Sequence, residues 1–373
     1  MKQYSLGDLI EIKHGYAFDG EHIIQEDNGI VLVTPGNFRI GGGFKEEKCK
    51  FFNGRIPSDF LFKGGEFIVT MTDLSKEIDT LGYSAHVPFS TTRKYLHNQR
   101  IGLVSFKNDE CDPDYVYYLM QTHDYQRSIA NTSTGATVHH TSPSKIQAYR
   151  FFAPGKDIQK KIAGILSNYD SLIDIDRKQI KLLEESAIRY FKHMFSGDLE
   201  DGGEYSLQDL AFFKRGKTIT KEDTYPGTIP VVAGGLSPAY YHNMANTDAP
   251  VITVSASGAN AGFTKLYFEK VWASDCSFVD SNTTQYLYFV YCLLKDKSKI
   301  INNLQKGAAQ PHVYAKDLNA LRFALPSEDS ISKFEEWATP VFGQIAILEK
   351  QIRQLQQARS ILIPRLYSND PII

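Results

Sequence analysis

A long stretch from Ile158 to Phe195 repeats apolar residues at alternating steps of four and three. This spacing places apolar side chains on one face of an α-helix. The predicted seam consists of Ile158, Ile162, Ile165, Tyr169, Leu172, Ile180, Leu183, Ala187, Tyr190 and Met194. Because so long an apolar stripe is unfavourable in water, the chain must provide a partner surface of similar length.

The stretch from Ile331 to Leu366 provides such a surface, with a heptad pattern and one polar exception, Arg359. Its predicted seam consists of Ile331, Phe334, Ala338, Val341, Ile345, Leu348, Ile352, Leu355, Leu362 and Leu366. We expect the two helices to pair as an antiparallel coiled coil, because each leads away from a different globular region. The alternative is two unrelated amphipathic helices packed on separate cores.

Three polar or helix-breaking residues interrupt these patterns. Pro340 and Pro364 lie inside the second one, and each is expected to kink or restart the helix because proline removes a backbone hydrogen bond. Asp176 lies on the first seam, at the expected level of Lys350 and Arg353. It either forms a salt bridge that fixes the register of the pair or faces solvent.

Short matches occur in the same order in the two halves of the chain. Tyr4-Ser5-Leu6-Gly7-Asp8-Leu9 corresponds to Tyr205-Ser206-Leu207-Gln208-Asp209-Leu210. Gly135-Ala136-Thr137 and then Pro154 correspond to Gly307-Ala308-Ala309 and then Pro326, and one of the long helices follows each proline. Several matches in one order indicate a duplicated unit of globule and helix rather than a coincidence.

Both globular regions are predicted to be mainly β, since they contain apolar, β-branched runs bounded by Gly and Pro. The expected fold class is therefore α+β, with two β-rich domains, two long helices between them and an internal pseudo-two-fold repeat. The predicted boundaries are 1–155 for the first domain, 156–196 for the first helix, 197–204 for a linker, 205–327 for the second domain, 328–367 for the second helix and 368–373 for a tail.

The composition is that of an ordinary soluble protein. The chain has no apolar run long enough for a membrane span, and its first ten residues include acidic and polar ones where a signal peptide would need an apolar core, so we expect neither a membrane span nor export. Its four cysteines are far apart, which argues against a zinc knuckle and a disulfide framework and favours a reducing compartment. A net charge of -2 means that any DNA contact relies on local patches.

Catalytic motifs are incomplete. Gly216-Lys217-Thr218 resembles the end of a phosphate-binding loop, but Ala211 stands where the first glycine is required. His139 and His140 are adjacent, and neighbours on a strand face opposite ways, so they cannot easily share a metal ion. No glycine-rich cofactor loop follows a strand. We expect a non-catalytic chain without metal or cofactor.

The repeated unit resembles the specificity subunit of type I restriction-modification systems. The resemblance covers the whole chain and rests on the order of Leu6-Gly7-Asp8-Leu9, Gly135-Ala136-Thr137, the helix entry Gln159-Lys160-Lys161-Ile162, and Ser257-Gly258-Ala259-Asn260 with Asp275. The second helix departs from the pattern, with Ser332-Lys333-Phe334 in place of Gln159-Lys160-Lys161. That departure puts equal docking of partners on the two repeats in doubt.

The resemblance implies two target recognition domains, each of which reads one half of a bipartite site in double-stranded DNA. The helices would set the gap and dock methyltransferase subunits, two in number, and restriction subunits would join in the full complex. Because the globules diverge through most of their length, the site is expected to be asymmetric, with half-sites addressed in opposite orientation.

Base reading requires paired donors and acceptors on loops that reach a groove. The candidate DNA-binding residues are Arg39, Lys76, Arg93, Lys94, Asn98, Arg100, Thr137, His139, His140, Lys214, Arg215, Lys217, Ser257, Asn260, Gln310 and His312. For each of them the alternative is a solvated surface side chain. Two rival functions are a fragment of a fused restriction or modification enzyme, which adenosylmethionine binding would reveal, and an interaction scaffold without a DNA role.

Overall fold

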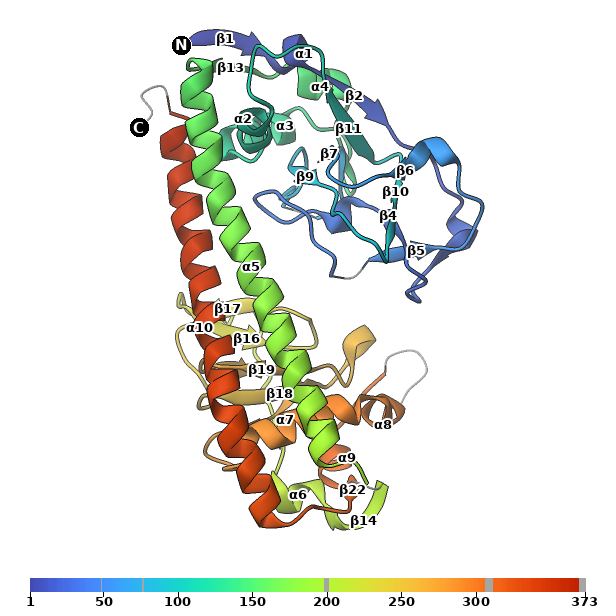
Figure 1. The fold of residues 1–373 in the computed structure, drawn as a ribbon, viewed down its shortest axis with the longest axis vertical. Helices are drawn as coiled ribbons and strands as arrows, with labels where there is room; N and C mark the ends of the chain where they lie inside the picture. The colour runs from blue at the N-terminus through green and yellow to red at the C-terminus, as the bar shows by residue number, and fades with distance from the viewer. Residues whose placement is uncertain (48, 76, 198–200, 306–310, 369–373) are drawn as a thin grey trace. The chain divides into compact units, whose positions relative to one another are not determined.

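Two long helices run through the structure, a computed structural model that describes residues 1–373 except 48, 76, 198–200, 306–310 and 369–373 (Figure 1). These helices are α5 (Lys156–Met194) and α10 (Glu328–Leu366). The chain divides into a first unit, Met1–Ile173 with Gln354–Ile373, and a second unit, Asp174–Arg353. Each unit therefore contains one β-rich domain and a part of both helices.

The helices are antiparallel in each unit. In the first unit, Ile162 near the start of α5 shares a core with Ile363 near the end of α10. In the second unit, Phe191 near the end of α5 shares a core with Phe334 near the start of α10. The predicted antiparallel pairing is confirmed, and the alternative of two unrelated helices on separate cores is wrong.

The buried face of α5 differs from the predicted seam. Ile158, Ile165 and Leu172 are 39%, 38% and 44% exposed, so their placement on a buried seam is wrong. The face that is buried in the first unit carries Gln159, Ile162, Ala163, Leu166 and Ile173. Neighbouring residues of a helix point about 100° apart, and the apolar pattern alone permits both faces.

Gln159 shows why this face of α5, and not the predicted one, is buried in the first unit. Its side-chain carbonyl accepts a hydrogen bond from the backbone N–H of Asp112 at 2.8 Å, and its amide donates to the carbonyl of Pro154 at 2.8 Å. The polar side chain is thus satisfied inside the first unit, which a hydropathy pattern does not report. Of the other predicted seam residues, Tyr190 is 36% exposed, so its place on a buried seam is also wrong. The buried ones are Ala187, Ile331, Phe334, Ala338, Ile345, Leu348 and Leu366, and the half-buried ones are Tyr169, Ile180, Leu183, Met194, Val341, Ile352, Leu355 and Leu362.

α10 continues through both prolines as one helix, so the expectation that they restart it is wrong. Pro340 and Pro364 are both exposed, and the carbonyls that lose their helical donor can be hydrated. Asp176 was expected either to face solvent or to form a salt bridge with the second helix. It does not face solvent, because it is only 4% exposed, and Arg353 pairs with Glu269 at 3.4 Å instead. Within the described residues, Asp176 Oδ2 has no hydrogen-bond partner.

The described part of the first unit contains two larger sheets. The antiparallel sheet has the order β2 (Ile10–His14), β11 (Ile101–Phe106), β7 (Phe67–Thr70), β9 (Ser84–His86). The mixed sheet has the order β3 (Ile23–Ile24), β5 (Lys50–Phe52), β4 (Ile30–Val33), β10 (Lys94–His97), β6 (Leu61–Phe62), with β4 and β10 parallel. The smaller elements are β1 (Lys2–Ser5) paired with β13 (Arg150–Ala153), β8 (Thr72–Asp73) paired with β12 (His139–His140), α1 (Leu6–Leu9), α2 (Pro113–Leu119), α3 (His123–Asn131) and α4 (Pro143–Gln147).

The second unit repeats this topology. Its antiparallel sheet has the order β15 (Lys214–Arg215), β21 (Cys276–Asp280), β18 (Val251–Ser255), β19 (Thr264–Tyr267). Its other sheet has the order β17 (Tyr240–His242), β16 (Ile229–Val232), β20 (Trp272–Ala273), with β16 and β20 parallel. The remaining elements are β14 (Asp201–Ser206) paired with β22 (Arg322–Phe323), α6 (Leu207–Leu210), α7 (Leu287–Asp296), α8 (Ser298–Asn303) and α9 (Ala315–Asn319). The predicted internal repeat is confirmed.

Helix caps explain the repeated opening sequence. Ser5 and Asp8 form a capping box on α1, in which the Ser5 N–H donates to Asp8 Oδ2 at 2.8 Å. Ser206 and Asp209 form the same box on α6, also at 2.8 Å. The serine hydrogen bonds lower the pKa of both aspartates. The matching sequence strings therefore encode a local turn that starts each domain.

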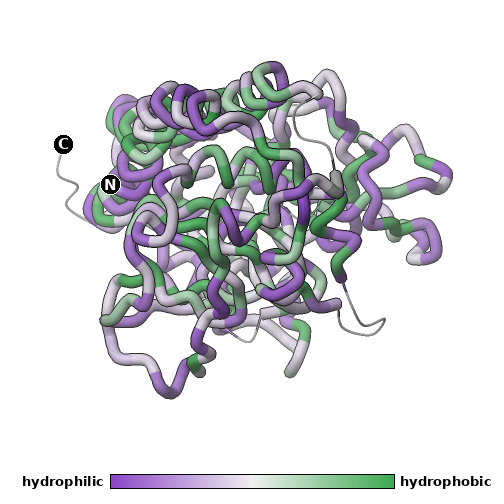
Figure 2. Tube along the Cα trace, turned by 90° about the horizontal axis from the view of Figure 1, so that it is seen from below, coloured by the Kyte–Doolittle hydropathy of each residue, from purple (hydrophilic) through white to green (hydrophobic). Residues whose placement is uncertain are grey.

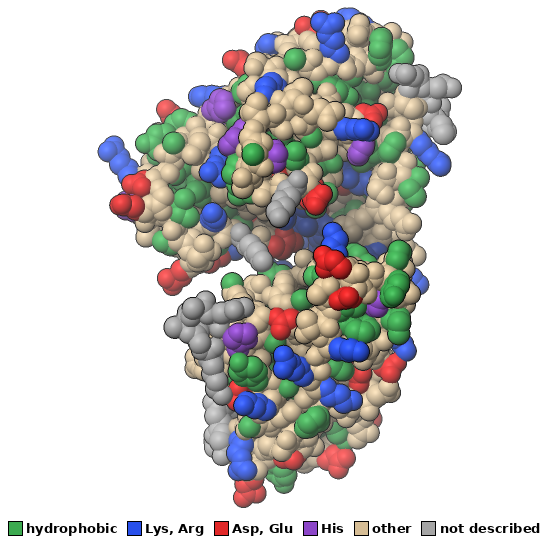
Figure 3. Space-filling model, turned by 180° about the vertical axis from the view of Figure 1, so that it is seen from behind, with side chains coloured by type: hydrophobic (Ala, Val, Ile, Leu, Met, Phe, Trp, Pro, Cys, Tyr) green, Lys and Arg blue, Asp and Glu red, His purple; other side chains and the backbone are tan. Residues whose placement is uncertain are grey.

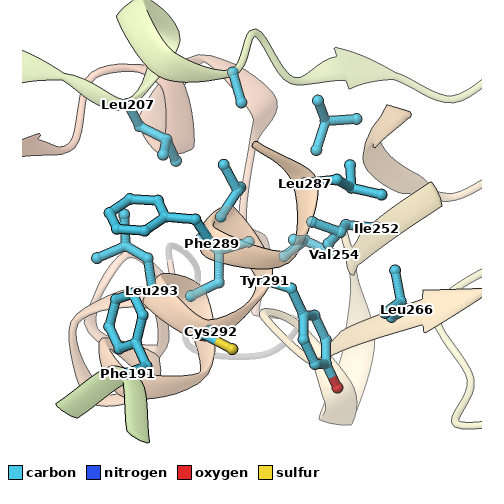
Figure 4. Packing of buried hydrophobic residues seen from close by; sticks show 14 of the residues in the cluster. Phe191, Leu207, Ile252, Val254, Leu266, Leu287, Phe289, Tyr291, Cys292 and Leu293 are labelled. Atoms are coloured by element: carbon cyan, nitrogen blue, oxygen red, sulfur yellow. The ribbon is translucent and has the colours of Figure 1, made fainter. Parts of the chain in front are cut away.

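Each unit is held together by its own core. In the second unit, Phe191 of α5 lies beside Leu293 and Phe289 of α7, and Ile252 of β18 belongs to the same core on its other side (Figure 4). Over short distances the chain alternates between apolar and polar segments, as expected for elements with one buried face (Figure 2). No helix in the described part of the chain is long and apolar enough to cross a membrane.

Candidate nucleic-acid interface

In the first unit, two loops that are distant in sequence meet where β8 pairs with β12. His139 pairs with Asp73 and His140 pairs with Thr72, so the loop after β8 lies beside the segment that contains Thr137. Gly135 has a φ of 106° and allows the tight turn that returns the chain to β12. The structure thus brings the predicted His139 and His140 to the loop that was expected to contain Lys76, although Lys76 itself lies outside the described residues.

A buried carboxylate shapes the loop after β8. Asp73 is 2% exposed and accepts hydrogen bonds from the Ser75 N–H at 2.7 Å and from the Thr80 N–H and hydroxyl at 2.6 and 2.7 Å. Burial alone would raise the pKa of Asp73, but these hydrogen bonds outweigh it and hold the pKa below its ordinary value. The loop then presents Leu74, which is 60% exposed. Sequence reasoning did not single out Asp73, although an aspartate two residues before Ser75 is typical of such turns.

Two predicted arginines are engaged in local ion pairs. Arg93 contacts Asp27 at 2.6 Å and Glu46 at 3.1 Å. Arg39 contacts Glu47 at 3.3 Å and donates from Nε to the carbonyl of Phe44 at 3.0 Å. Any phosphate or base contact by these guanidinium groups has to compete with carboxylates already in place.

Asn98 and Arg100 belong to the turn between β10 and β11. Asn98 is only 6% exposed, and its side-chain carbonyl accepts the Arg100 N–H at 3.0 Å. Asn98 therefore stabilises the turn and does not reach outward, which corrects the expectation that it lies on a groove-facing loop. Arg100 and Lys94 are exposed. Arg100 is close to the paired loops, because its carbonyl accepts the N–H of Met71, next to β8, at 3.0 Å.

In the second unit, the predicted basic cluster lies on and after β15. Lys214, Arg215 and Lys217 are all exposed, and β15 forms the edge of its sheet beside β21. The Lys217 ammonium is 6.0 Å from the centroid of the Trp272 ring, and Trp272 Nε1 donates to the Lys217 carbonyl at 2.8 Å. Three exposed cations on one short edge suit the phosphates of a nucleic acid.

The other predicted residues of this unit gather at the end of β18. Ser257 forms an isolated β-bridge with His312, and its hydroxyl donates to Asp275 Oδ2. Asn260 donates to the carbonyl of Gly234 at 3.0 Å. His312 stacks on Tyr314, with ring centroids 5.7 Å apart. Tyr314, which is 41% exposed, was missed as a separate candidate because only its stacking on His312 distinguishes it from other loop tyrosines.

Charges are mixed around these loops. On the face seen in Figure 3, Lys and Arg side chains are interspersed with Asp and Glu side chains over the second unit. Gln310 lies outside the described residues, as does Gly307-Ala308-Ala309. Among the residues that the structure describes, no group of His, Cys, Asp or Glu side chains is arranged to hold a metal ion.

The exposed face of α5 carries an apolar stripe in the first unit. Ile158, Ile165 and Leu172 recur every seven residues, so they lie along one line on the helix surface. We call these three residues the outer stripe of α5. At the same distances from its own start, α10 has Ser330, Trp337 and Gln344.

Comparisons with a family model and with curated proteins identify the same family. The family model described as the type I restriction modification DNA specificity domain matches residues 1–185 and 200–357. The type I restriction enzyme MjaIX specificity subunit of Methanocaldococcus jannaschii is 25% identical over 292 residues, which cover 68% of either chain. The MjaVIII specificity subunit of the same organism is 19% identical over 198 residues, or 52% of this chain and 45% of that one.

A solved structure has the same fold. The crystal structure of a type I restriction-modification system S subunit from M. genitalium aligns with a TM-score of 0.56 and 17% identity, covering 99% of this chain and 96% of that one. At this level of identity the likeness concerns the fold alone.

Proposed function

Because the chain belongs to the type I restriction-modification DNA specificity family, as a specificity subunit that matches the family model twice, we propose that its two domains each read one half of a bipartite DNA site. Residues 1–155 and 205–327 would be the two target recognition domains. The helical segments 156–196 and 328–367 would set the gap between the half-sites.

One observation carries this proposal: the two domains share a sheet framework but present different loops. Both have an antiparallel sheet with the same strand order and a parallel strand pair beside it. At the end of the equivalent strands, the first domain has the loop anchored by Asp73 and the second has the short turn from Ser257 to Asn260. A common framework with different loops is what two different half-sites require.

The proposed role is non-catalytic and depends on partners. The chain would bind double-stranded DNA together with two methyltransferase subunits, and restriction subunits would complete the complex in the cytoplasm. The outer stripe of α5 is the proposed docking site for a methyltransferase helix, since exposed apolar stripes mark interaction surfaces. The fused-enzyme alternative predicts adenosylmethionine binding by the isolated chain, and we expect none.

Methylation mapping tests the proposal. DNA from cells that carry the chain with its methyltransferase subunit is compared with DNA from cells that lack only this chain. We expect a bipartite, asymmetric methylated motif that disappears with the chain. Unchanged methylation, with the partner shown to be expressed and bound, would refute the specificity role and favour the scaffold alternative.

A further inference from the structure

A histidine occupies the same place in both domains. In the first, His140 pairs with Thr72 across the β8–β12 ladder. In the second, His312 forms a β-bridge with Ser257. In each case the partner carries a hydroxyl and stands two residues after another hydroxyl residue, Thr70 or Ser255.

Backbone hydrogen bonds establish that these places are equivalent. The residue after each histidine donates to the residue before each hydroxyl partner: Thr141 to Met71 at 3.0 Å, and Val313 to Ala256 at 2.9 Å. These bonds hold the same two chain segments side by side in both domains. The match that begins at Gly135 and Gly307 already places His140 opposite His312 in the sequence, and these bonds add the hydroxyl partner of each histidine.

The strand that leads into each hydroxyl partner is also equivalent. The Gly82 N–H donates to the Thr70 carbonyl at 3.0 Å, and the Gly262 N–H donates to the Ser255 carbonyl at 2.9 Å. The Thr70 hydroxyl reaches the Thr72 carbonyl at 2.9 Å, and the Ser255 hydroxyl reaches the Ser257 carbonyl at 3.5 Å. The two hydroxyl–histidine pairs therefore sit on the same local framework.

Neither histidine is part of a core. His140 is exposed and His312 is half-buried. His140 Nδ1 lies 3.1 Å from the Thr72 hydroxyl, which itself is buried. Both rings are therefore accessible to solvent, and a buried core does not require a histidine at either place.

The residue next to each hydroxyl–histidine pair, in contrast, carries a different charge in the two domains. Met71 donates its N–H to the carbonyl of Arg100 at 3.0 Å, and Ala256 donates to the carbonyl of Asp275 at 3.2 Å. Arg100 and Asp275 thus occupy equivalent backbone places with opposite charges. Arginine suits guanine and a carboxylate suits the amino group of cytosine, so these neighbours suit different bases.

We propose that His140 and His312 are equivalent contacts to the phosphodiester backbone, one in each half-site. This inference rests on the proposed function. The two half-sites are expected to differ in base sequence, but both have the same phosphate backbone. A side chain that is present at the same place in both domains is therefore suited to contact that backbone. Backbone contacts fix the register of a protein on the duplex and leave sequence reading to the residues that differ.

The hydroxyl gives the His140 ring a defined role. When the Thr72 hydroxyl donates to Nδ1, the ring proton resides on Nε2, and Nε2 donates to a phosphate oxygen. The hydroxyl then positions the imidazole in its place beside β8. His140 acts on the backbone directly, and Thr72 acts only through it.

The test uses the full chain assembled with its methyltransferase subunits. His140→Ala and His312→Ala are compared with wild type for binding to the cognate duplex and to duplexes with either half-site scrambled. Each substitution is expected to weaken binding to every duplex by about tenfold, as for loss of one hydrogen bond to a charged group. The ratio between cognate and scrambled duplexes and the methylated motif should stay unchanged. His140→Gln, which keeps a donor, should recover part of the affinity.

Arg100→Ala is the matched control, since it is expected to change discrimination at the first half-site. The inference is overturned if His140→Ala alters the methylated motif, because that means base reading. It is also overturned if affinity is unchanged on all duplexes while the melting temperature falls, because that means a purely structural role. A wild-type complex without sequence preference would instead refute the proposed function itself.

Discussion

Gly15 and Gly216 occupy equivalent places in the two units, each pressed against a pair of backbone carbonyls. A Cβ on Gly15 would collide with the carbonyl oxygens of Asn98 and His97. A Cβ on Gly216 would collide with those of Ser274 and Ala273. Neither glycine has a positive φ, so the requirement is for space rather than for backbone conformation.

Gly15→Ala is therefore expected to destabilise the chain by about 2–3 kcal/mol, because the colliding atoms are backbone and cannot rotate away. Gly164→Ala is the control. Gly164 lies within α5 with no atom close to an added Cβ, and alanine there should stabilise by up to about 1 kcal/mol. Urea unfolding followed by circular dichroism measures both. Equal midpoints for Gly15→Ala and wild type would contradict the close approach.

Asp73 makes the stability of the first unit depend on pH. Its pKa is held below the ordinary value of about 3.9, so its hydrogen bonds add stability that is fully present above that value. The stability is lost as the pH falls through the lower, folded-state pKa. Asp73→Asn should therefore destabilise at pH 7, and the difference from wild type should shrink at the acidic end.

Unfolding free energies measured from pH 7 down to about 3 check this expectation. Asp59→Asn serves as a control, since Asp59 is exposed and lies outside the loop. A wild-type advantage that stayed constant over the whole range would mean that the Asp73 hydrogen bonds do not depend on its charge.

At the scale of the element, the two long helices have similar buried faces but different exposed faces. Both contribute a buried face to the cores of the two units. On the outer face, Ile165 of α5 corresponds to Trp337 of α10, which packs on Tyr190 with ring centroids 4.1 Å apart. Leu172 corresponds to the exposed Gln344. The proposed docking of a methyltransferase helix should therefore be stronger on the outer stripe of α5.

Ile165→Glu combined with Leu172→Glu should reduce binding of the methyltransferase subunit at least tenfold, because docking would bury two unpaired charges. The melting temperature should hardly change, since both positions are exposed. Gln344→Glu on α10 is the control and should have little effect. Co-purification and sedimentation with the partner measure binding. Retained binding by the double variant would place docking elsewhere.

Arg359 shows what the polar exception in the second seam does. Its guanidinium pairs with Asp170 of α5 at 2.8 Å and lies over the Tyr118 ring, 5.6 Å from the centroid. The Tyr118 hydroxyl donates to the same carboxylate at 2.9 Å. This network links both helices to α2, so the exception ties the helix pair to the first domain.

For the whole molecule, the proposed ruler makes a quantitative prediction. Deleting Asp174–Ile180 from α5 together with Ile347–Arg353 from α10 removes one heptad from each helix at the junction of the two units. Seven helical residues span about 10 Å, and a heptad nearly preserves the helix face. At about 3.4 Å per base pair, the preferred gap should shorten by about three base pairs.

Methylation mapping on a series of sites with altered gaps measures the shift. Both half-sites should be read as before, because neither β-rich domain is changed. Deleting the heptad from α5 alone is the control, and it should abolish a single preferred gap by breaking the register of the pair. An unmoved gap in the doubly shortened chain would exclude the helices as the ruler.

The sequence by itself determined the features that depend on local pattern. The long helices follow from periodicity, and the domain starts follow from capping boxes such as Ser5 with Asp8. Only the tertiary structure decided which face of α5 is buried, where Gln159 displaces Ile158, and that Asn98 turns inward. It also decided that His140 meets Thr72 and His312 meets Ser257. Such choices arise from contacts between residues far apart in the chain, and a local pattern carries no information about them.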